Sequence, residues 1–530
     1  MSLLTHSRRL LKDVATYGLG DVATSIINVL LIPIYSHILS TEEVGIIALL
    51  VGLEAGMKIV LRWGVDSAFM RLYFDCKDDA ARQTLASTIW LFLMVLNAPV
   101  FGLAIAFAPE VAELLFGVPG YTATLRIFLI NTFLLTFTFI PFHVYRIEGR
   151  TQRFAALTFT RAFGSVLLRL LFIVQLGMGV VGVVIADLLL TIVVIAAMAP
   201  TFAGLLRPRF DRRVLGEALH FGGPRVPHGI AHQVTATADR WMLRQSGAPL
   251  GVIGIYGMGA TVGLGMKLFL SAFEYAWAPF YLDTMRRPEA KQIYSRITTY
   301  VTAVLALLAA GMAALAHDVV HLMVAPKFWD AHRVVPWIGL GVLCQGFYQL
   351  TAIGLNITKR TASLPLATIT AASVAIGLNL ILLPRVGMIG AAWTYTASYA
   401  AMAVVGMTLS QRVYPISYEW RRIGQLAIAA VLAWAAGRLI AQAPLPMIVR
   451  LLATGVTVVA IYPIVLWLLG FFRPGEVQML VRMRDQLTSV ARRTSPGEET
   501  EIAGEIADTP SIVDHTEPDA ADPPKSRKVE

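Results

Sequence analysis

The sequence has few charged residues for its length, and this shortage excludes most soluble proteins. Asp, Glu, Lys and Arg make up 15% of its 530 residues and hydrophobic residues make up 56%, with a mean hydropathy of +0.65. A soluble domain has roughly 25% charged residues. The composition therefore predicts a membrane protein that crosses the bilayer many times.

Cysteine is also scarce. The two cysteines, Cys76 and Cys344, lie in a basic loop and in an apolar segment, so the sequence provides neither a disulfide framework nor a metal cluster. We therefore expect no cofactor and no redox chemistry. A small-residue cleavage site is likewise missing after Arg8, Arg9 and Lys12. The first apolar run is therefore predicted to be retained and not removed as a signal peptide.

Apolar segments of about 20 residues, the length of a transmembrane helix, recur along the chain. They predict an all-α polytopic membrane protein with about fourteen transmembrane helices. The expected spans are 14–38, 44–66, 85–108, 122–145, 154–175, 180–204, 218–241, 250–282, 297–316, 333–354, 362–383, 388–409, 422–441 and 447–472.

Basic residues exceed acidic ones, giving a formal net charge of +10. In a soluble protein such an excess would suggest binding to nucleic acid. Here the basic residues lie in short loops between apolar runs, so we expect no nucleic-acid partner. The N-terminus and every second loop carry most of them, for example 207–213 and 286–296. The positive-inside rule then predicts a multi-pass protein with both termini in the cytoplasm.

The chain contains an internal repeat. A shift of 209 residues places Gly45 on Gly254 and the segment 56–58, Gly-Met-Lys, on the identical segment 265–267. A shift of 208 places 179–182 on 387–390, each with glycine at both ends. Six spans separate the copies, so both copies begin on the same side of the membrane. We expect two parallel six-helix repeats related by a pseudo-twofold axis along the membrane normal.

This repeat defines the predicted domains. Residues 1–208 form an N-terminal six-helix lobe, 209–412 form a C-terminal six-helix lobe, and 413–473 add two transmembrane helices. A basic interfacial helix is expected at 474–493 because apolar residues recur there at helical spacing. The remainder, 494–530, is rich in Pro, Glu, Asp and Ser and is expected to be a disordered cytoplasmic tail.

Charged residues inside the predicted spans are the candidate site, because a charge in the bilayer is costly unless it faces protein or water. Glu54, Lys58 and Arg62 are spaced four residues apart, so they share one helix face. The candidates for a cationic cavity that binds an anionic substrate are Lys58, Arg161, Arg169, Arg225 and Lys267. The ion-coupling candidates are Glu54, Asp187 and Asp239.

Structural explanations compete with these roles. Three bases, Lys58, Arg169 and Lys267, are also explained as partners of Glu54 or Asp187 in structural salt bridges. Three residues near the inner ends of their spans, Arg62, Arg225 and Glu274, are also explained as side chains that reach toward the inner membrane surface. If the lobes are related by a twofold axis, Lys58 and Lys267 are expected to face each other across the cleft between them. His317, His321 and His332 have metal-ligand spacing, but no acid accompanies them in a catalytic position. We therefore interpret them as the end of a helix and predict no metal site.

Several segments resemble the polysaccharide flippases of the multidrug/oligosaccharidyl-lipid/polysaccharide exporter superfamily, which includes O-antigen flippases. The resemblance extends over about residues 10–475. Each segment is degenerate, but their order is specific. The resembling segments are 33–36 running into 39–45, 64–68 with Arg71, 146–150, 239–240, 254–256, 276–280, 355–360 and 387–392.

The resemblance implies a V-shaped transporter in the bacterial cytoplasmic (inner) membrane. Such a protein moves a polyprenyl-diphosphate-linked oligosaccharide to the outer leaflet by alternating access, for lipopolysaccharide or exopolysaccharide synthesis. Coupling to H⁺ or Na⁺ is implied as well. The role of holding the diphosphate transfers loosely to Arg161, Arg169 and Lys58. The implied partners are this lipid-linked oligosaccharide, membrane lipids, a polysaccharide polymerase and glycosyltransferases.

Three other functions stay open from the sequence. A multidrug/cation antiporter of the same fold usually has about twelve spans and a more acidic cavity. A polysaccharide polymerase or ligase needs a sizeable outer loop with catalytic groups, whereas the longest outer loop expected here is 317–333, so we expect the protein not to be an enzyme. A nonenzymatic scaffold is the third alternative.

Overall fold

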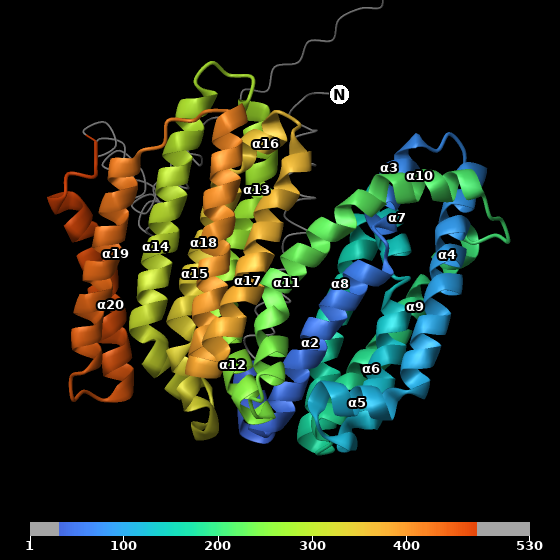
Figure 1. Cartoon of the computed structure of the whole chain (residues 1–530), viewed down its shortest axis with the longest axis horizontal. Helices are drawn as coiled ribbons and strands as arrows, with labels where there is room; N and C mark the ends of the chain where they lie inside the picture. The colour runs from blue at the N-terminus through green and yellow to red at the C-terminus, as the bar shows by residue number, and fades with distance from the viewer. Residues whose placement is uncertain (1–30, 474–530) are drawn as a thin grey trace, which may run out of the picture. The chain divides into compact units, whose positions relative to one another are not determined.

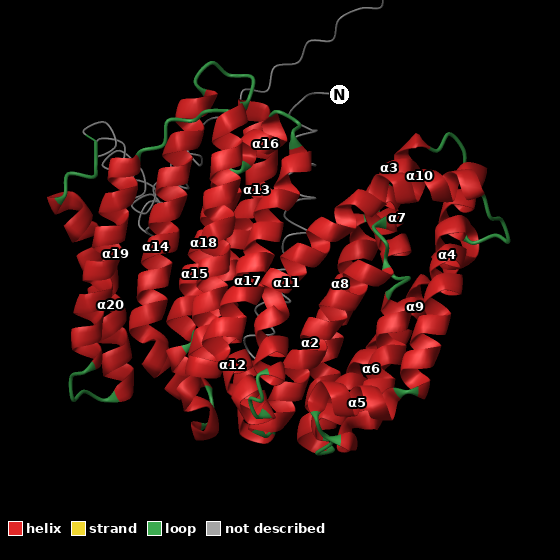
Figure 2. Cartoon of the chain, in the orientation of Figure 1, coloured by secondary structure: helices red, strands yellow, loops and turns green. Residues whose placement is uncertain are grey.

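The computed structural model describes residues 31–473, in which every regular element is a helix (Figure 2). The first predicted span lies mostly outside the described residues, and the segments 474–493 and 494–530 lie entirely outside them. Residues 31–38 are helical. The described helices belong to one compact unit that ends at Leu469.

The first group of helices, here called the N-lobe, corresponds to the first predicted repeat (Figure 1). It contains α2 (Thr41–Leu61), α3 (Val65–Asp75), α4 (Asp79–Ala106), α5 (Ala108–Phe116), η1 (Pro119–Tyr121), α6 (Thr122–Leu135), α7 (Phe139–Ile147), α8 (Thr151–Arg169), the π-helix η2 (Leu170–Gln175) and α9 (Gly179–Leu205).

The second group, the C-lobe, follows a crossing segment made of α10 (Arg212–Gly222) and η3 (Gly223–Arg225). The C-lobe contains α11 (Val226–Gln245), α12 (Leu250–Gly263), η4 (Leu264–Met266), α13 (Lys267–Thr284), α14 (Ala290–Met323), η5 (Pro326–Arg333), α15 (Val335–Thr351), α16 (Ile353–Ile357), η6 (Thr361–Ser363), α17 (Leu364–Val386) and α18 (Met388–Val413). The C-terminal pair is α19 (Trp420–Ala441) and α20 (Met447–Leu468).

Local sequence signals explain where several helices begin. Ser40 and Glu43 form a capping box at α2, in which the Ser40 hydroxyl accepts a hydrogen bond from the Glu43 amide at 3.1 Å and the Glu43 carboxylate accepts one from the Ser40 amide at 2.8 Å. The Asp78 carboxylate accepts a hydrogen bond from the Ala81 amide at 2.7 Å and caps α4. These caps satisfy amides that the helices leave unpaired.

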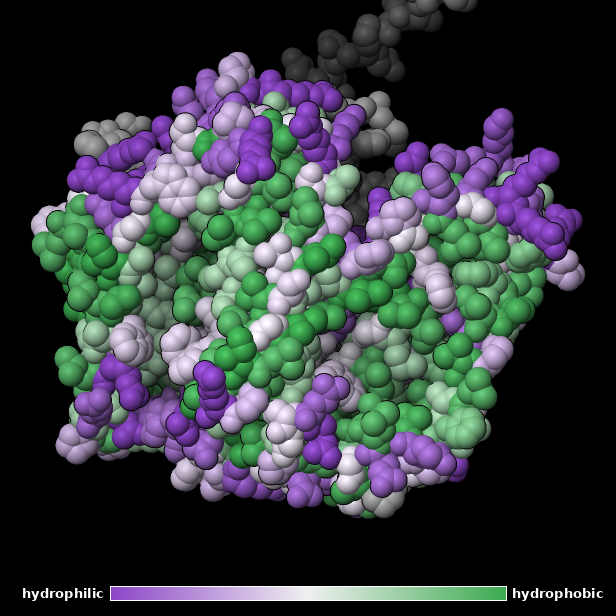
Figure 3. Space-filling model, viewed as in Figure 1, coloured by the Kyte–Doolittle hydropathy of each residue, from purple (hydrophilic) through white to green (hydrophobic). Residues whose placement is uncertain are grey.

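Eleven helices in the described part of the chain are long and apolar enough to cross a membrane. Helices α11 and α18 lie where the seventh and twelfth spans were expected, but they are more polar and are not among the eleven. A wide apolar belt separates two hydrophilic ends on the visible surface (Figure 3). The helices therefore have the surface of a polytopic membrane protein.

Several segments expected as single spans are interrupted inside the protein. The span 122–145 divides into α6 and α7, 218–241 divides at η3, and 250–282 divides at η4. Between α6 and α7, the Thr136 and Thr138 hydroxyls donate hydrogen bonds to the carbonyls of Thr132 and Leu135, both at 2.9 Å. Hydroxyls that bond the local backbone in this way compete with regular helix geometry.

The two lobes meet at residues that the repeat aligns. Helix α2 packs on α12, and a Cβ atom added at Gly45 would lie 3.2 Å from the backbone nitrogen of Gly254. A Cβ at Gly254 would lie 2.9 Å from the backbone nitrogen of Gly45. Glycine is therefore required at both positions for the helix backbones to approach so closely. This reciprocal contact is what a twofold relation between the lobes requires.

The crossing segment returns to the N-lobe. Helix α10 packs on α3 and α4, and Ala218 is buried in one cluster with Val65 and Phe69. The C-terminal pair packs on α14 of the C-lobe. There the Arg450 guanidinium of α20 donates to the Asp318 carboxylate of α14 at 2.6 Å, and Asp318 is almost completely buried.

Candidate functional site

A polar cavity of about 590 Å³, here called the N-lobe cavity, lies among α2, α6, α7, α8 and α9. Its volume lies within the range of small-molecule sites. The ionisable groups in its lining are four arginines, one histidine and three acids, a formal excess of one positive charge with histidine neutral. They are Arg62, Arg146, Arg161, Arg169, His143, Glu54, Asp66 and Asp187.

The best-ordered contact of the cavity is the ion pair of Arg169 and Asp187. The Arg169 Nη2 donates to both Asp187 oxygens, at 2.8 and 2.9 Å, and its Nε donates at 3.1 Å. The Arg169 Nη1 also donates to the Tyr35 hydroxyl at 3.2 Å. This bidentate geometry satisfies both ions and holds α8 to α9. Directly after Arg169 the backbone changes from α-helix to the π-helix η2.

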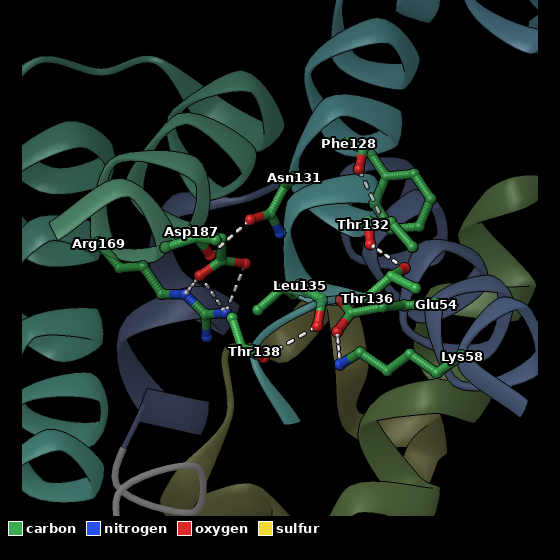
Figure 4. Close-up of polar contacts among 11 residues, drawn as sticks. Glu54, Lys58, Phe128, Asn131, Thr132, Leu135, Thr136, Thr138, Arg169 and Asp187 are labelled. Atoms are coloured by element: carbon green, nitrogen blue, oxygen red, sulfur yellow. Dashed lines mark hydrogen bonds and ion pairs between the residues drawn. The ribbon is translucent and has the colours of Figure 1, made fainter. Parts of the chain in front are cut away.

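A second ion pair joins Lys58 to Glu54 on α2. About a quarter of each side chain is exposed, and Lys58 lies in the last turn of the helix, where a positive charge is favourable. In Figure 4 the two ion pairs lie on either side of Leu135 and Thr138 at the end of α6. Both pairs correspond to the salt bridges that the sequence left open as the structural explanation.

Arg161 differs from the other predicted bases because it lines the cavity without a partner. Within residues 31–473 it has no hydrogen bond and no ion pair. Arg62 is held loosely, since its Nη1 lies 3.9 Å from an Asp66 oxygen and its guanidinium stacks on Phe139 at 5.2 Å. The free positive charge of the cavity is therefore centred on Arg161.

The other three predicted site residues lie elsewhere. Arg225 is in η3, where its guanidinium stacks on Phe221 at 4.3 Å. Lys267 is the first residue of α13 and lies 6.0 Å from the centre of the Tyr399 ring. Asp239 is buried in α11 and accepts hydrogen bonds from the Tyr256 hydroxyl and the Arg240 amide. The two lysines aligned by the repeat therefore have different partners.

Sequence reasoning missed several cavity residues. Arg146 lies just after the expected span 122–145, and Arg62 is also explained as a residue that reaches toward the inner membrane surface, yet both line the cavity. Arg146 lies on α7, which begins at Phe139 after the break that ends α6 at Leu135. The available signal was the group of threonines at 132, 136 and 138 followed by Pro141, a composition that weakens a helix.

The C-lobe carries a second hollow of opposite character. This C-lobe groove, of about 970 Å³, lies among α14, α15, α18 and α19. Its walls are mainly alanine and larger apolar side chains, among them Leu340, Val404 and Trp434. Charged and imidazole groups gather near the η5 end, where His317, His332, Arg333 and Arg438 lie. Helix α19 of the C-terminal pair supplies one complete wall.

Comparisons with known proteins give one matching family and several structures of similar fold. A family model described as "Polysaccharide biosynthesis protein" matches residues 34–333. Among solved structures, the lipid II flippase MurJ in an inward closed conformation is similar, with a TM-score of 0.65 and 12% identity over 86% of this chain and 98% of MurJ.

Multidrug transporters share the fold as well. An inward-facing multidrug resistance MATE family transporter of the MOP superfamily is similar with a TM-score of 0.53 and 16% identity, over 77% of this chain and 94% of that chain. A crystal structure of a mutant MATE protein has a TM-score of 0.51 and 18% identity, over 79% of this chain and 96% of that chain. A search of curated protein sequences found no significant match. These identities establish a common fold.

Proposed function

The chain belongs to the polysaccharide biosynthesis protein family, and we propose that within it the protein is a flippase. Its substrate is a polyprenyl-diphosphate-linked oligosaccharide, which it moves across the cytoplasmic membrane for cell-surface or exopolysaccharide synthesis by alternating access. The observation that carries the proposal is the presence in one chain of a polar cavity with an unpaired guanidinium and a separate long apolar groove. These two sites match the two ends of such a lipid.

The N-lobe cavity suits the diphosphate. Arg161 has no competing carboxylate among the described residues, and a guanidinium binds phosphate oxygens in pairs. Arg62 is the second donor, because its contact with Asp66 at 3.9 Å is too long for a strong hydrogen bond. Arg169 has a different role, since its donors are engaged by Asp187 and Tyr35. It holds the cavity wall in place.

The C-lobe groove suits the polyprenyl chain. Burial of apolar surface stabilises such a complex by about 25 cal/mol per Å², and alanines on facing helices leave room for a branched chain. Helix α19 completes the groove, which gives the C-terminal pair a function. MurJ is a lipid II flippase, and its similar fold supports a lipid-linked cargo here.

Ion coupling is part of the proposal. Glu54 lines the cavity and is paired with Lys58, so a proton or Na⁺ at Glu54 would release Lys58 for the diphosphate. Asp187 and Asp239 are the other candidate carboxylates. If Glu54 couples transport to an ion gradient, Glu54→Gln should still transport but should lose its dependence on the gradient. Transport that responds to the gradient as in the wild type would remove Glu54 from this role.

The multidrug antiporter is the competing function. An organic cation requires an unpaired carboxylate, but Glu54 and Asp187 are each paired with a base. The third carboxylate of the lining, Asp66, lies 3.9 Å from Arg62, and the lining as a whole has a formal excess of one positive charge. The polarity of the cavity therefore favours an anionic substrate.

Complementation of a flippase-deficient strain tests the proposal. Arg161→Ala, inserted at the wild-type level, should abolish complementation, and Arg161→Lys should restore part of it because the charge returns without the paired geometry. Arg126→Ala is the control, since Arg126 is exposed on α6 and does not line the cavity. Full complementation by Arg161→Ala would overturn the proposed role of the cavity.

A further inference from the structure

A third hollow lies at the end of the N-lobe where the loops are rich in arginine. This basic-end pocket has a volume of about 480 Å³ and is built from the ends of α3, α4, α7, α8 and α9. The pocket and the N-lobe cavity share no lining residue, since Arg146 lines the cavity whereas Arg150 and Arg153 line the pocket. Its charged and hydroxyl groups are Asp79, Arg82, Glu148, Arg150, Arg153, Tyr73 and Thr201.

Two of the three arginines are held by neighbouring acids. The Arg150 Nε lies 2.7 Å from a Glu148 oxygen, and the Arg82 Nη1 lies 3.1 Å from an Asp79 oxygen. Arg150 is 47% exposed and Arg82 is 37% exposed. Ion pairs of this exposure contribute little to stability, so a phosphate group can replace either carboxylate as a partner.

Tyr73 contacts both Glu148 and Arg82. Its hydroxyl donates to the Glu148 carboxylate at 2.8 Å, and the Arg82 guanidinium stacks on its ring at 5.2 Å. Burial and the neighbouring Glu148 raise the pKa of Tyr73, so the hydroxyl stays protonated and remains a donor. The ring thereby fixes the plane of Arg82, and the edge of the guanidinium stays available for oxygen ligands.

Arg153 is the third arginine of the pocket, and its contacts differ from those of Arg82 and Arg150. It lies in the first turn of α8, is exposed, and makes no hydrogen bond or ion pair with any residue of the described range 31–473. No side chain caps the amino terminus of α8. Three arginines against two acids leave the lining with a formal charge of +1, carried by Arg153.

We propose that the basic-end pocket binds the phosphate group of a membrane lipid, with Arg153 as the main ligand and Arg82 and Arg150 as exchangeable ones. The pocket is hollow, has apolar side chains from Val144, Pro200 and Leu205 beside its charges, and lies at an end of the transmembrane helices. A lipid headgroup with its first glycerol or isoprenoid carbons fits this combination. The site is separate from the N-lobe cavity, and its test does not require transport.

Binding to the purified full-length protein tests this site. The probe is fluorescent dioctanoyl phosphatidylglycerol, with the phosphate-free dioctanoylglycerol analogue as a comparison. Arg153→Gln should weaken binding of the phosphatidylglycerol probe about tenfold, the loss expected for a charge-assisted contact, and Arg153→Lys should recover part of it. Arg209→Gln is the matched control, because Arg209 is an exposed arginine of the α9–α10 loop that does not line the pocket.

Competition experiments identify the source of the phosphate. Displacement of the probe by farnesyl diphosphate would support the site and assign it to the cargo headgroup, whereas binding of phosphatidylglycerol that farnesyl diphosphate does not displace would support it and assign it to a bilayer lipid. Three results would each overturn the proposal. The first is an equal loss of phosphatidylglycerol affinity in Arg153→Gln and Arg209→Gln, and the second is binding of the phosphate-free analogue as tight as that of phosphatidylglycerol. The third is displacement of the probe by inorganic phosphate as effectively as by lipid.

Discussion

The N-lobe cavity and the C-lobe groove occupy equivalent halves of an internal repeat, yet their linings differ in kind. The cavity is lined by seven arginines and acids, and three of them, Glu54, Arg169 and Asp187, are held in close ion pairs. The larger groove has alanine-rich walls with polar groups gathered near one end. Under the proposed function, this difference separates a site for a charged head from a site for an apolar tail. The glycine contact of α2 and α12 joins the two lobes.

The largest effect is expected where this contact joins the two regions. Gly45→Leu would place a side chain against the backbone of α12, where even a Cβ atom lies 3.2 Å from the Gly254 nitrogen. Overpacking of this kind should destabilise the protein by about 3 kcal/mol or more. Thermal unfolding in detergent measures it, with Gly56→Ala as the control on the same helix, since a Cβ at Gly56 meets nothing within 4 Å. Equal stability of both variants would contradict the close contact.

The next effect concerns the cavity alone. Asp187→Ala would leave Arg169 without its bidentate partner. A cost of about 2 kcal/mol is expected, below that of a fully buried pair because 20% of the Arg169 side chain is exposed. The double variant Arg169→Leu/Asp187→Leu should recover most of this stability. Asp66→Ala is the control, because Asp66 lies 3.9 Å from Arg62. The free energy of unfolding in denaturant measures both effects. Equal losses of stability in Asp187→Ala and Asp66→Ala would contradict the difference between the close ion pair and the loose one.

The groove is tested by narrowing it. Ala427→Trp fills the wall formed by α19 and should slow transport of a long polyprenyl substrate about tenfold, the equivalent of two lost methylene contacts, without slowing a short-tailed analogue. Ile428→Trp is the control, since Ile428 is 51% exposed on the same helix and does not line the groove. If both variants affect long and short tails alike, the groove does not hold the tail.

The smallest effect lies at the end of the N-lobe, outside both regions. Tyr73→Phe removes the hydroxyl that donates to Glu148 and should cost about 1 kcal/mol. Because burial raises the pKa of Tyr73 when the protein folds, its contribution is present below about pH 10 and is lost as the pH rises further. Unfolding followed between pH 8 and pH 11, roughly the range that brackets a free tyrosine, should show the two proteins converging at high pH.

The sequence predicted the class of protein and most helices but not the arrangement of the site. Long apolar runs and alternating loop charge identify spans because the bilayer imposes a fixed length. Arg169 and Asp187 are 18 positions apart and on different helices, so their pairing depends on how α8 packs on α9. The break at Thr136–Thr138 accompanies hydrogen bonds from side-chain hydroxyls to the local backbone, which a hydropathy pattern does not contain.

Lys58 and Lys267 also show that the sequence did not predict the contacts of individual side chains. Their alignment follows from identical tripeptides, but α2 continues through residues 55–57 whereas the chain becomes a 3₁₀-helix at 264–266. Lys58 therefore lies in the last turn of α2, whereas Lys267 is the first residue of α13. A sequence repeat therefore predicts that two backbones are related, but it does not predict which residues their side chains contact.

The most direct test of the central claim is translocation in proteoliposomes that contain the purified wild-type protein. We predict that a fluorescent polyprenyl-diphosphate oligosaccharide crosses the bilayer, that Arg161→Ala abolishes this movement, and that an organic cation such as ethidium is not exported. Movement of ethidium but not of the lipid-linked oligosaccharide, in the wild type, would contradict the account and assign the cavity to an antiporter.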